Sequence, residues 1–335
     1  MTLSPYRAAM RALGLYTPPS VRKGLVPYGT KPQPENPEPL DDFLFCAIVK
    51  SWMEEDIIEA TVRNLFTQGV DRVYLVDHSS TDSTVERAVA AGATVAEIFD
   101  NEVFDQRLVQ TLENAVVAKE SLRSGADHIW WIYVDPDEFP EGPGGMSLRE
   151  YLLTLDFRFR IVGARFMNHL PDKKPEYVSG FHPIDFQPVC YQLEPWKNWN
   201  CEHWKHPLQR FDRNRPFLQS EIGAHNASGG GRKAQAEPPG GIVIHHFQYR
   251  AEEVTRARLE RLDTKAKGPR GAPKPMGLGL FDDRLARLDA VYGGQWDQIK
   301  TDTRRPVGRI SPWPHLEQVR RWYSESDLAD AARLS

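Results

Sequence analysis

The sequence predicts an α/β fold with a mostly parallel central sheet, and three observations support this prediction. Apolar runs long enough for strands alternate with helical patterns between residues 43 and 134. The strand runs are continuously apolar, which is typical of a sheet that is covered on both faces. Strands that alternate with helices form βαβ units, and these units build parallel sheets.

Strand and helix alternate without interruption at the start of the predicted domain. Residues 43–49 are wholly apolar and predict a buried strand, and residues 55–68 continue with helical spacing up to Gly69, a helix stop. Residues 72–76 predict a second apolar strand. A polar turn follows this strand and leads into an N-capped helix at about residues 83–91.

The pattern continues in the same way and then loosens after residue 140. In chain order, the further elements expected are a strand at 94–99, a helix at 108–124, a strand at 129–134, a helix at 147–155, strands at 161–168 and 242–244, and a helix at 252–265. Additional helices are expected near residues 280–291 and 313–333, whereas residues 172–212 show little regular pattern.

These elements divide the chain into three parts. Residues 1–42 are rich in proline and predict an extended N-terminal arm, because such a segment builds little regular structure. Residues 43–260 hold the α/β domain, and residues 261–335 are expected to form a helical C-terminal extension.

The composition is that of a globular protein and argues against several classes of function. The 335 residues are 40% hydrophobic and carry a formal net charge of -4, so nothing indicates a nucleic-acid partner. Three cysteines cannot form a disulfide framework, so we expect a reducing compartment and a cytoplasmic location. No apolar run fits a transmembrane segment or a signal peptide, although peripheral contact with a membrane stays open.

Three carboxylates follow the buried strand at residues 129–134 and are the strongest functional signal in the sequence. Asp135, Asp137 and Glu138 are costly at such a place unless a cation or water compensates them. Residues i and i+2 of an extended chain point to one side, so Asp135 and Asp137 are expected to converge on one divalent ion. Oxygen ligands of this kind suit Mg²⁺ or Mn²⁺. The plain alternative is a solvated acidic turn.

Three motifs in chain order resemble those of the family 2 glycosyltransferases with a GT-A fold, the Rossmann-like fold of nucleotide-diphospho-sugar transferases. They are Ala47–Glu55, where a strand leads into an acidic turn, the polar turn Asp77–Thr84, and Asp135–Phe139 after the fourth strand. The D-x-D-E-F form, together with the later segment His245–Arg250, is similar to a divergent subgroup of that family. The resemblance covers roughly residues 43–260.

The resemblance implies how a nucleotide-sugar donor is bound. Asp77 is expected to hydrogen-bond the nucleotide base, and Glu54 or Glu55 is expected to hold the base or the ribose. Asp135 is expected to contribute to donor binding as well as to the metal site.

The resemblance also implies a metal site for the diphosphate. Asp135 and Asp137 are the expected metal pair, with Asp137 the more direct ligand. A histidine late in the domain often completes such a site, and His246 rather than His245 is expected to do so here. Successive residues of a strand point to opposite sides, so only one of the two can face the site.

The catalytic base is less clearly indicated. An inverting transfer needs a carboxylate or an imidazole that takes the proton of the acceptor hydroxyl. Glu221 is the first choice and His225 the second, because both lie in a short polar turn just before a glycine-rich loop. Asp185, Glu194 and Glu202 are the other candidates, and a structural polar role is the alternative for each.

Two further patterns point to other sites. Cys190, Cys201, His203 and His206 have the residue types of a zinc site but lack the paired C-x-x-C spacing. The glycine-rich loop at residues 228–233 lacks the order of a phosphate-binding loop, so it is either a plain loop or a basic lid over the diphosphate.

Together these features predict a metal-dependent glycosyltransferase that uses Mn²⁺ or Mg²⁺. It would move a sugar from a nucleotide-sugar, with a UDP-sugar as first choice, to a glycan, lipid-linked or small-molecule acceptor with inversion. Two alternatives stay open, namely a metal-dependent nucleotidyltransferase or phosphohydrolase, and a non-catalytic nucleotide-sugar-binding protein on the same scaffold.

Overall fold

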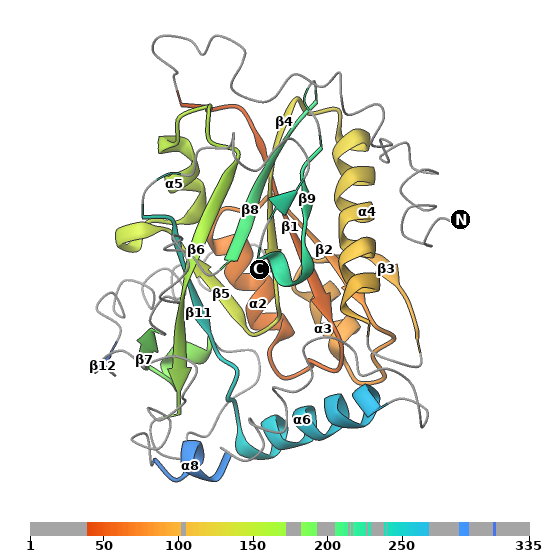
Figure 1. Cartoon of the computed structure of the whole chain (residues 1–335), viewed down its shortest axis with the longest axis vertical. Coiled ribbons are helices and arrows are strands. Elements are labelled where there is room, and N and C mark those ends of the chain that lie inside the picture. Colours follow the sequence, from red (N-terminus) through yellow and green to blue (C-terminus); the bar gives the residue numbers. More distant parts are fainter. Residues whose placement is uncertain are drawn as a thin grey trace, which may run out of the picture.

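The computed structural model describes most of the predicted α/β domain. The described residues are 39–101, 105–171, 182–192, 205–213, 215, 217–225, 227–228, 238, 240–267, 288–294 and 311–312. Within them, ten strands form one mixed sheet, and helices pack on both of its faces (Figure 1).

The first four strands form the parallel part of the sheet. Their bounds are Leu44–Ser51 for β1, Arg72–Asp77 for β2, Thr94–Ile98 for β3 and His128–Val134 for β4. The connecting helices are α2 (Ile58–Thr67), α3 (Thr84–Ala90) and α4 (Gln106–Ser124). The strand order is β4-β1-β2-β3 and every pair is parallel, so the predicted βαβ arrangement is confirmed.

The rest of the sheet combines parallel and antiparallel pairs. Its strands are β5 (Glu138–Glu141), β6 (Ile161–Leu170), β7 (Val189–Gln192), β8 (Lys205–Asp212), β11 (Ile242–His246) and β12 (Ser311–Pro312). β8 is antiparallel to β4 on one side and to β6 on the other. β11 runs parallel to β6 and antiparallel to β5. Of these strands, the sequence indicated only β6 and β11.

β8 escaped prediction because its sequence is polar, although all eight of its residues are buried. Its charged side chains find partners elsewhere in the fold. Arg160 Nε and Arg210 Nε each lie 2.8 Å from a carboxylate oxygen of Asp212, and His128 Nδ1 lies 2.8 Å from Oδ1 of the same residue. Paired charges can be buried at an acceptable cost, so a polar segment becomes an inner strand.

Several shorter elements complete the fold. A separate two-stranded sheet pairs β9 (Gln219–Ser220) with β10 (Ala227–Ser228), and 3₁₀ turns occur at η2 (Pro143–Gly145), η3 (Pro183–Asp185) and η4 (Ile222–Ala224). The remaining helices are α5 (Leu148–Thr154), α6 (Glu252–Lys267) and α8 (Leu288–Tyr292). Ser147 and Glu150 form a capping box at the start of α5.

The predicted division of the chain is only partly visible. The boundary expected at residue 260 lies inside α6, and β12 pairs with β7, so part of the C-terminal extension packs with the sheet. The arm up to residue 38 and the helix expected at 313–333 lie outside the described residues. Among the described helices, none has the length and the apolar character that a membrane span requires.

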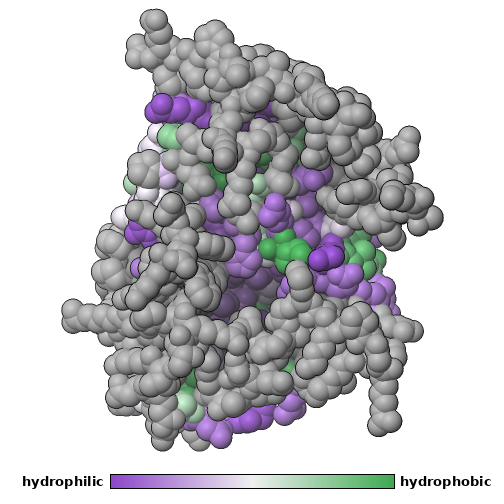
Figure 2. Space-filling model, viewed as in Figure 1, coloured by the Kyte–Doolittle hydropathy of each residue, from purple (hydrophilic) through white to green (hydrophobic). Residues whose placement is uncertain are grey.

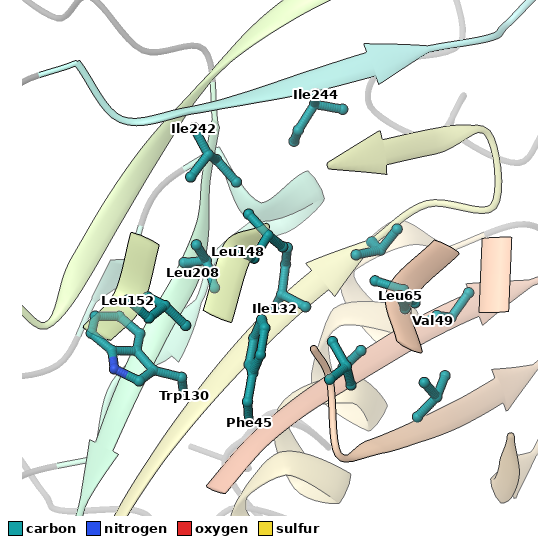
Figure 3. Close-up of a cluster of buried hydrophobic side chains, with 14 of the residues drawn as sticks. Phe45, Val49, Leu65, Trp130, Ile132, Leu148, Leu152, Leu208, Ile242 and Ile244 are labelled. Carbon is teal, nitrogen blue, oxygen red and sulfur yellow. The ribbon is translucent and has the colours of Figure 1, made fainter. Parts of the chain in front are cut away.

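Apolar side chains fill both sides of the sheet. On one side, Phe45 and Val49 of β1 pack with Ile132 of β4 under α2 and α5 (Figure 3). On the other side, Ile48 and Trp131 pack with α4. Alternate residues of β1 thus enter two different cores, which explains why its sequence is continuously apolar.

The parallel register brings the carboxyl ends of three strands together. Ser51 of β1 pairs with Asp77 of β2, and Val49 of β1 pairs with Val134 of β4. Asp77 and Asp135 are therefore separated by one strand, or about 10 Å at the usual spacing between strands. Ligands of open α/β sheets bind at this end.

Candidate functional site

Asp135 lies at the carboxyl end of β4 between two lysines. The register that pairs Val134 with Val49 places the next residues of both strands, Asp135 and Lys50, side by side. Lys50 Nζ lies 2.7 Å from Asp135 Oδ1, and Lys205 Nζ, at the start of β8, lies 3.2 Å from Oδ2. The side chain of Asp135 is still 29% exposed, so solvent reaches it.

Two glutamates complete this inner cluster, which consists of Lys50, Glu113, Asp135, Glu138 and Lys205. Burial raises the pKa of Glu138 to about 8, with the charge of Asp135 acting in the same direction and Lys205 against it. Burial likewise raises the pKa of Glu113 to about 7. Burial alone would raise the pKa of Asp135, but Lys205 and Lys50 outweigh it and hold that pKa below its ordinary range. Asp135 is therefore the permanent anion of the inner cluster.

Asp137 faces a different set of partners. Arg258 Nη2 of α6 lies 2.9 Å from Asp137 Oδ2, and His246 Nε2 lies 3.6 Å from the same oxygen. The carbonyl oxygen of Asp137 accepts a hydrogen bond of 2.8 Å from the backbone N–H of Phe247. Burial would raise the pKa of Asp137, but Arg258 and His246 hold it well below the ordinary value. Asp135 and Asp137 thus belong to two neighbouring clusters.

The outer cluster consists of Glu54, Asp56, Asp137, His246, Arg250 and Arg258. Arg250 is fully buried, and its Nη1 lies 2.7 Å from Glu54 Oε2 and 3.0 Å from Asp56 Oδ1. Arg258 Nε lies 3.3 Å from Glu54 Oε1. Burial raises the pKa of Glu54, against the effect of both arginines. The structure thus places Glu54, expected to hold base or ribose, between two arginines of the chain itself.

Asn168 of β6 sets the orientation of the His246 ring. Its Oδ1 lies 2.9 Å from His246 Nδ1, and the parallel register pairs the two residues directly. An amide oxygen only accepts, so Nδ1 carries a hydrogen, and Nε2, which faces Asp137, is the nitrogen left to bind a metal ion. A metal-binding imidazole needs this tautomer, and a partner on its other nitrogen is what usually selects it.

His245 points away from the site, as the strand alternation predicts. Its Nδ1 lies 2.9 Å from His169 Nε2, and its Nε2 lies 2.8 Å from Glu141 Oε2. His169 Nδ1 in turn lies 2.5 Å from the carbonyl oxygen of Gln187. The side chains of Glu141, His169 and His245, which are linked by these hydrogen bonds, are all buried. Only His246 of the two neighbours lies beside the acidic end of β4.

Asp77 is fully buried and organises the turn after β2. Its Oδ1 accepts hydrogen bonds from the hydroxyls of Ser51 and Ser80, at 2.6 and 2.8 Å, and its Oδ2 accepts one of 2.7 Å from the Ser80 N–H. Ser79 between them has a φ of 45°, a left-handed conformation that is uncommon outside glycine. Asp77 therefore shapes the loop at this edge, and its contact with a nucleotide base stays a prediction.

The loops after β1 and β2 are hydrogen-bonded to each other. The backbone N–H of Glu54 donates to Thr84 Oγ1 at 2.8 Å, and the N–H of Ser83 donates to Glu55 Oε2 at 3.1 Å. The structure thus places the Glu55 carboxylate, the other candidate for base or ribose, at the first turn of α3. These bonds hold the two loops as one unit.

Three aromatic rings border the same edge of the sheet. The ring of His78, after β2, stacks on that of Phe99, after β3, with centroids 4.6 Å apart and an interplanar angle of 3°. The ring of Trp52, after β1, lies 5.7 Å from that of His78. His78 is buried between the other two rings, so a planar base could stack only on the half-buried rings of Trp52 and Phe99. No role for these rings was predicted from the sequence.

The two candidate bases lie in the segment between β9 and β10. Asn114 of α4 holds the segment through two bonds with the backbone of Ser220, of 2.8 and 3.0 Å. His206 Nδ1, in the second residue of β8, lies 2.8 Å from the carbonyl oxygen of His225. The side chain of Glu221 is exposed and that of His225 is half-buried. The segment therefore lies beside the first residues of β8, close to the inner cluster.

The other candidates are only partly described. Glu194, Glu202, Cys201, His203 and the loop at 229–233 lie outside the described residues. Burial in β7 raises the pKa of Cys190 to about 12, which disfavours the thiolate that binds zinc. Within the part of the chain that the structure describes, no group of three or more His, Cys, Asp or Glu side chains is placed to hold a metal ion alone.

Comparison with known proteins supplies no family for this chain. No protein-family model matches it, and no curated protein matches it. Among solved structures, a glucosyl-3-phosphoglycerate synthase from Mycobacterium tuberculosis in complex with Mg²⁺ and UDP is similar, with 20% identity, 37% of this chain and 43% of that chain covered, and a TM-score of 0.26. The present chain thus spans less than half of that structure.

Two further complexes of the same enzyme are similar over a longer stretch. The complex with Mn²⁺, UDP and glucosyl-3-phosphoglycerate is 14% identical, with 68% of this chain and 81% of that chain covered and a TM-score of 0.33. The complex with Mn²⁺, UDP-glucose and phosphoglyceric acid is 16% identical, with the same coverage and a TM-score of 0.35. These identities and TM-scores are low, so no residue role or substrate follows from them.

The residues present fit a divalent ion that a substrate helps to bind. Two ligands of one octahedral ion at about 2.1 Å lie about 3 Å apart, so the 3.6 Å between Asp137 Oδ2 and His246 Nε2 requires only a small adjustment. Mg²⁺ is usually held by one or two protein groups, with water and substrate phosphates as the other ligands. Figure 2 shows a recess lined by hydrophilic residues near the centre of the face seen in Figure 1.

The cationic half of the site was not predicted from the sequence. Lys50, Lys205, Arg250 and Arg258 all bind carboxylates of the two clusters. Lys50 directly follows an apolar strand, which was a usable signal, because strand ends carry the site residues. No local pattern distinguishes Lys205 or Arg258, since their partners are remote in the sequence.

Proposed function

We propose that this protein is a metal-dependent glycosyltransferase that moves a sugar from a nucleotide-sugar, in the first place a UDP-sugar, to a glycan, lipid-linked or small-molecule acceptor with inversion. The observation that carries the proposal is the pair of Asp137 and His246 at the carboxyl end of a parallel sheet. Four cationic side chains surround this pair and its neighbour Asp135. Anionic diphosphates need such positive surroundings.

The two clusters are proposed to bind a nucleoside diphosphate in different ways, one through a metal ion and the other through lysine side chains. Asp137 and His246 would hold Mn²⁺ or Mg²⁺, which supplies the charge neutralisation that a departing diphosphate requires. Lys50 and Lys205 add two positive charges at Asp135, where the low exposure of Lys205 strengthens their electrostatic effect. The resemblance to family 2 glycosyltransferases implies a metal site of Asp135, Asp137 and His246, which agrees with this proposal for Asp137 and His246.

The remaining roles follow from position. The aromatic rings of Trp52 and Phe99 are proposed to support the nucleotide base next to the turn of Asp77. Glu221 is proposed as the base that takes the acceptor proton, because its side chain is exposed in the segment that the His225 carbonyl oxygen joins to the start of β8, and His225 is the second choice. A cytoplasmic location is part of the proposal.

Ligand binding and product analysis test the proposal together. Nucleoside diphosphates and their sugars should raise the melting temperature in the presence of Mn²⁺ and much less in its absence, because a ligand of the native state stabilises it. Incubation with UDP-sugars and acceptor mixtures should then yield UDP and a glycosylated product. Release of pyrophosphate or phosphate from nucleoside triphosphates would instead identify a nucleotidyltransferase or phosphohydrolase, and binding without turnover would identify a non-catalytic protein.

A further inference from the structure

We infer that Arg258 is a resident counter-ion of Asp137 which leaves this carboxylate when a divalent ion binds, and then binds the donor diphosphate. Arg258 Nη2 lies 2.9 Å from Asp137 Oδ2, whereas His246 Nε2 lies 3.6 Å from the same oxygen. An ion held by Asp137 and His246 and the guanidinium of Arg258 therefore compete for one oxygen. The identity of the diphosphate rests on the proposed function, but the competition itself does not.

The two arginines of the outer cluster differ in their freedom to move. Arg250 is fully buried and bound to both Glu54 and Asp56, so its release would break two ion pairs at once. The side chain of Arg258 is 17% exposed. It also keeps a second partner, Glu54 Oε1 at 3.3 Å, when it leaves Asp137. Arg258 is therefore the arginine that a divalent ion can displace from its carboxylate.

The helix that carries Arg258 can stay in place during this exchange. Arg261, one turn further along α6, donates to the carbonyl oxygen of Met53 at 3.3 Å. At the other end, Thr255 Oγ1 accepts a hydrogen bond of 2.9 Å from the Arg250 N–H. In Figure 1, α6 lies across the lower end of the molecule, and these two contacts tie it to the loops there. Only the side chain of Arg258 has to rotate.

The charges of the site favour the exchange. The two clusters contain six carboxyl groups, those of Glu54, Asp56, Glu113, Asp135, Asp137 and Glu138. Against these stand four cationic side chains, those of Lys50, Lys205, Arg250 and Arg258. A divalent ion brings two positive charges where the departing guanidinium removes one, so Asp137 stays neutralised. A diphosphate that arrives with the ion brings new negative charge, and the released guanidinium can pair with it.

Titration of the free protein with Mn²⁺ tests the inference without any sugar transfer. The electron paramagnetic resonance signal of the unbound ion reports the affinity in the absence of nucleotide. The variant is Arg258→Met, which keeps the length of an apolar stem and removes the charge. The matched control is Arg256→Met on the same helix, because Arg256 binds Glu252 and Asp289 rather than the site.

Arg258→Met should bind Mn²⁺ at least about tenfold more tightly than the wild type, because the ion no longer competes with a guanidinium. In saturating Mn²⁺, the same variant should bind UDP about tenfold more weakly, since the diphosphate loses one cationic partner. Arg256→Met should change neither affinity. Arg258→Gln, which keeps a hydrogen-bond donor but no charge, should behave like Arg258→Met and serves if the methionine variant does not fold.

Unchanged or weaker Mn²⁺ binding in folded Arg258→Met or Arg258→Gln overturns the inference. Failure of both the wild type and the variants to bind Mn²⁺ overturns the inference and the metal dependence of the proposed function together. Tighter Mn²⁺ binding by the variants, with no transfer from any donor by the wild type, leaves the competition standing and refutes the glycosyltransferase proposal alone.

Discussion

The imidazole rings of His169 and His245 share a hydrogen bond of 2.9 Å, from Nδ1 of His245 to Nε2 of His169. Which ring donates in this bond follows from the other hydrogen bond of His169. His169 Nδ1 faces a carbonyl oxygen and must carry hydrogen, while burial lowers the pKa of His169 well below the ordinary value and keeps the ring neutral. His169 Nε2 therefore accepts from His245 Nδ1, and the other ring nitrogen of His245, Nε2, lies 2.8 Å from Glu141 Oε2.

Replacement of His245 should mainly lower stability, whereas replacement of His246 should mainly weaken metal binding. His245→Ala should lower the free energy of unfolding by about 2–4 kcal/mol, because it removes the hydrogen-bond partner of two buried atoms, His169 Nε2 and Glu141 Oε2. His246→Ala should cost less stability but raise the Mn²⁺ concentration needed for nucleotide binding by at least about tenfold. Chemical denaturation and a metal titration measure the two effects. The reverse outcome would make His245 the metal-facing residue.

Asn168 should control the metal affinity although it does not face the ion directly. Asn168→Ala removes the acceptor that keeps hydrogen on His246 Nδ1, so we expect Mn²⁺ affinity to fall roughly 10–100-fold with little loss of stability. Asn168→Asp keeps an oxygen acceptor at the same place and should retain binding. Equal affinities of the wild type and Asn168→Ala in a Mn²⁺ titration would show that the ring needs no such support.

Asp137→Asn should abolish metal-dependent binding of UDP and leave the fold intact. The amide has the shape of the carboxylate but a much weaker attraction for Mn²⁺, and the backbone bond from Phe247 to residue 137 is unaffected. Glu59→Gln on α2 is the control, because Glu59 pairs with Arg63 and not with the site. Calorimetric titration of UDP in Mn²⁺ checks the result, and unchanged affinity in Asp137→Asn would remove Asp137 from the metal site.

Asp212 should make the fold sensitive to acid. Burial would raise its pKa, but the bond with His128 and the charges of Arg210 and Arg160 lower it to about 2. The unfolded chain binds this proton near pH 4, so the stabilising contribution of about 2–3 kcal/mol is complete above pH 5 and disappears as the pH falls toward 2. Urea unfolding across this range should show a flatter acid limb for Asp212→Asn. Parallel limbs for both proteins would contradict the assignment.

The sequence predicted well the elements whose signal is local. The apolar runs of β1, β2 and β4 and the helical spacing of α2, α3 and α4 lie within a few residues of their predicted places. The helix expected at 147–155 begins at its cap, Ser147, and this start is readable from the sequence because a cap and its partner are near in the chain. A strand that is buried on both faces has a continuously apolar sequence, and this pattern predicts the strand without knowledge of the residues that pack against it.

The missed elements depend on remote partners. β5 contains Pro140 and pairs only with β11 among the described strands, so it lies at an edge, where proline is tolerated in a sheet. β8 is polar but buried, because Arg160 and His128 neutralise its Asp212. The aspartates of the site could be identified because they directly follow the apolar run of β4, which is a local signal. Arg258 offered no local signal. Sequence patterns thus located the carboxylates and not their counter-charges.

The position of β11 late in the chain has a consequence for folding during synthesis on the ribosome. β4 and β5 are synthesised long before β11 and α6, so the carboxylates of Asp137 and Glu141 emerge without His246, Arg258 and His245. Contacts between segments so far apart in the chain form slowly and late. An incomplete chain therefore exposes acidic groups that only its last third can neutralise.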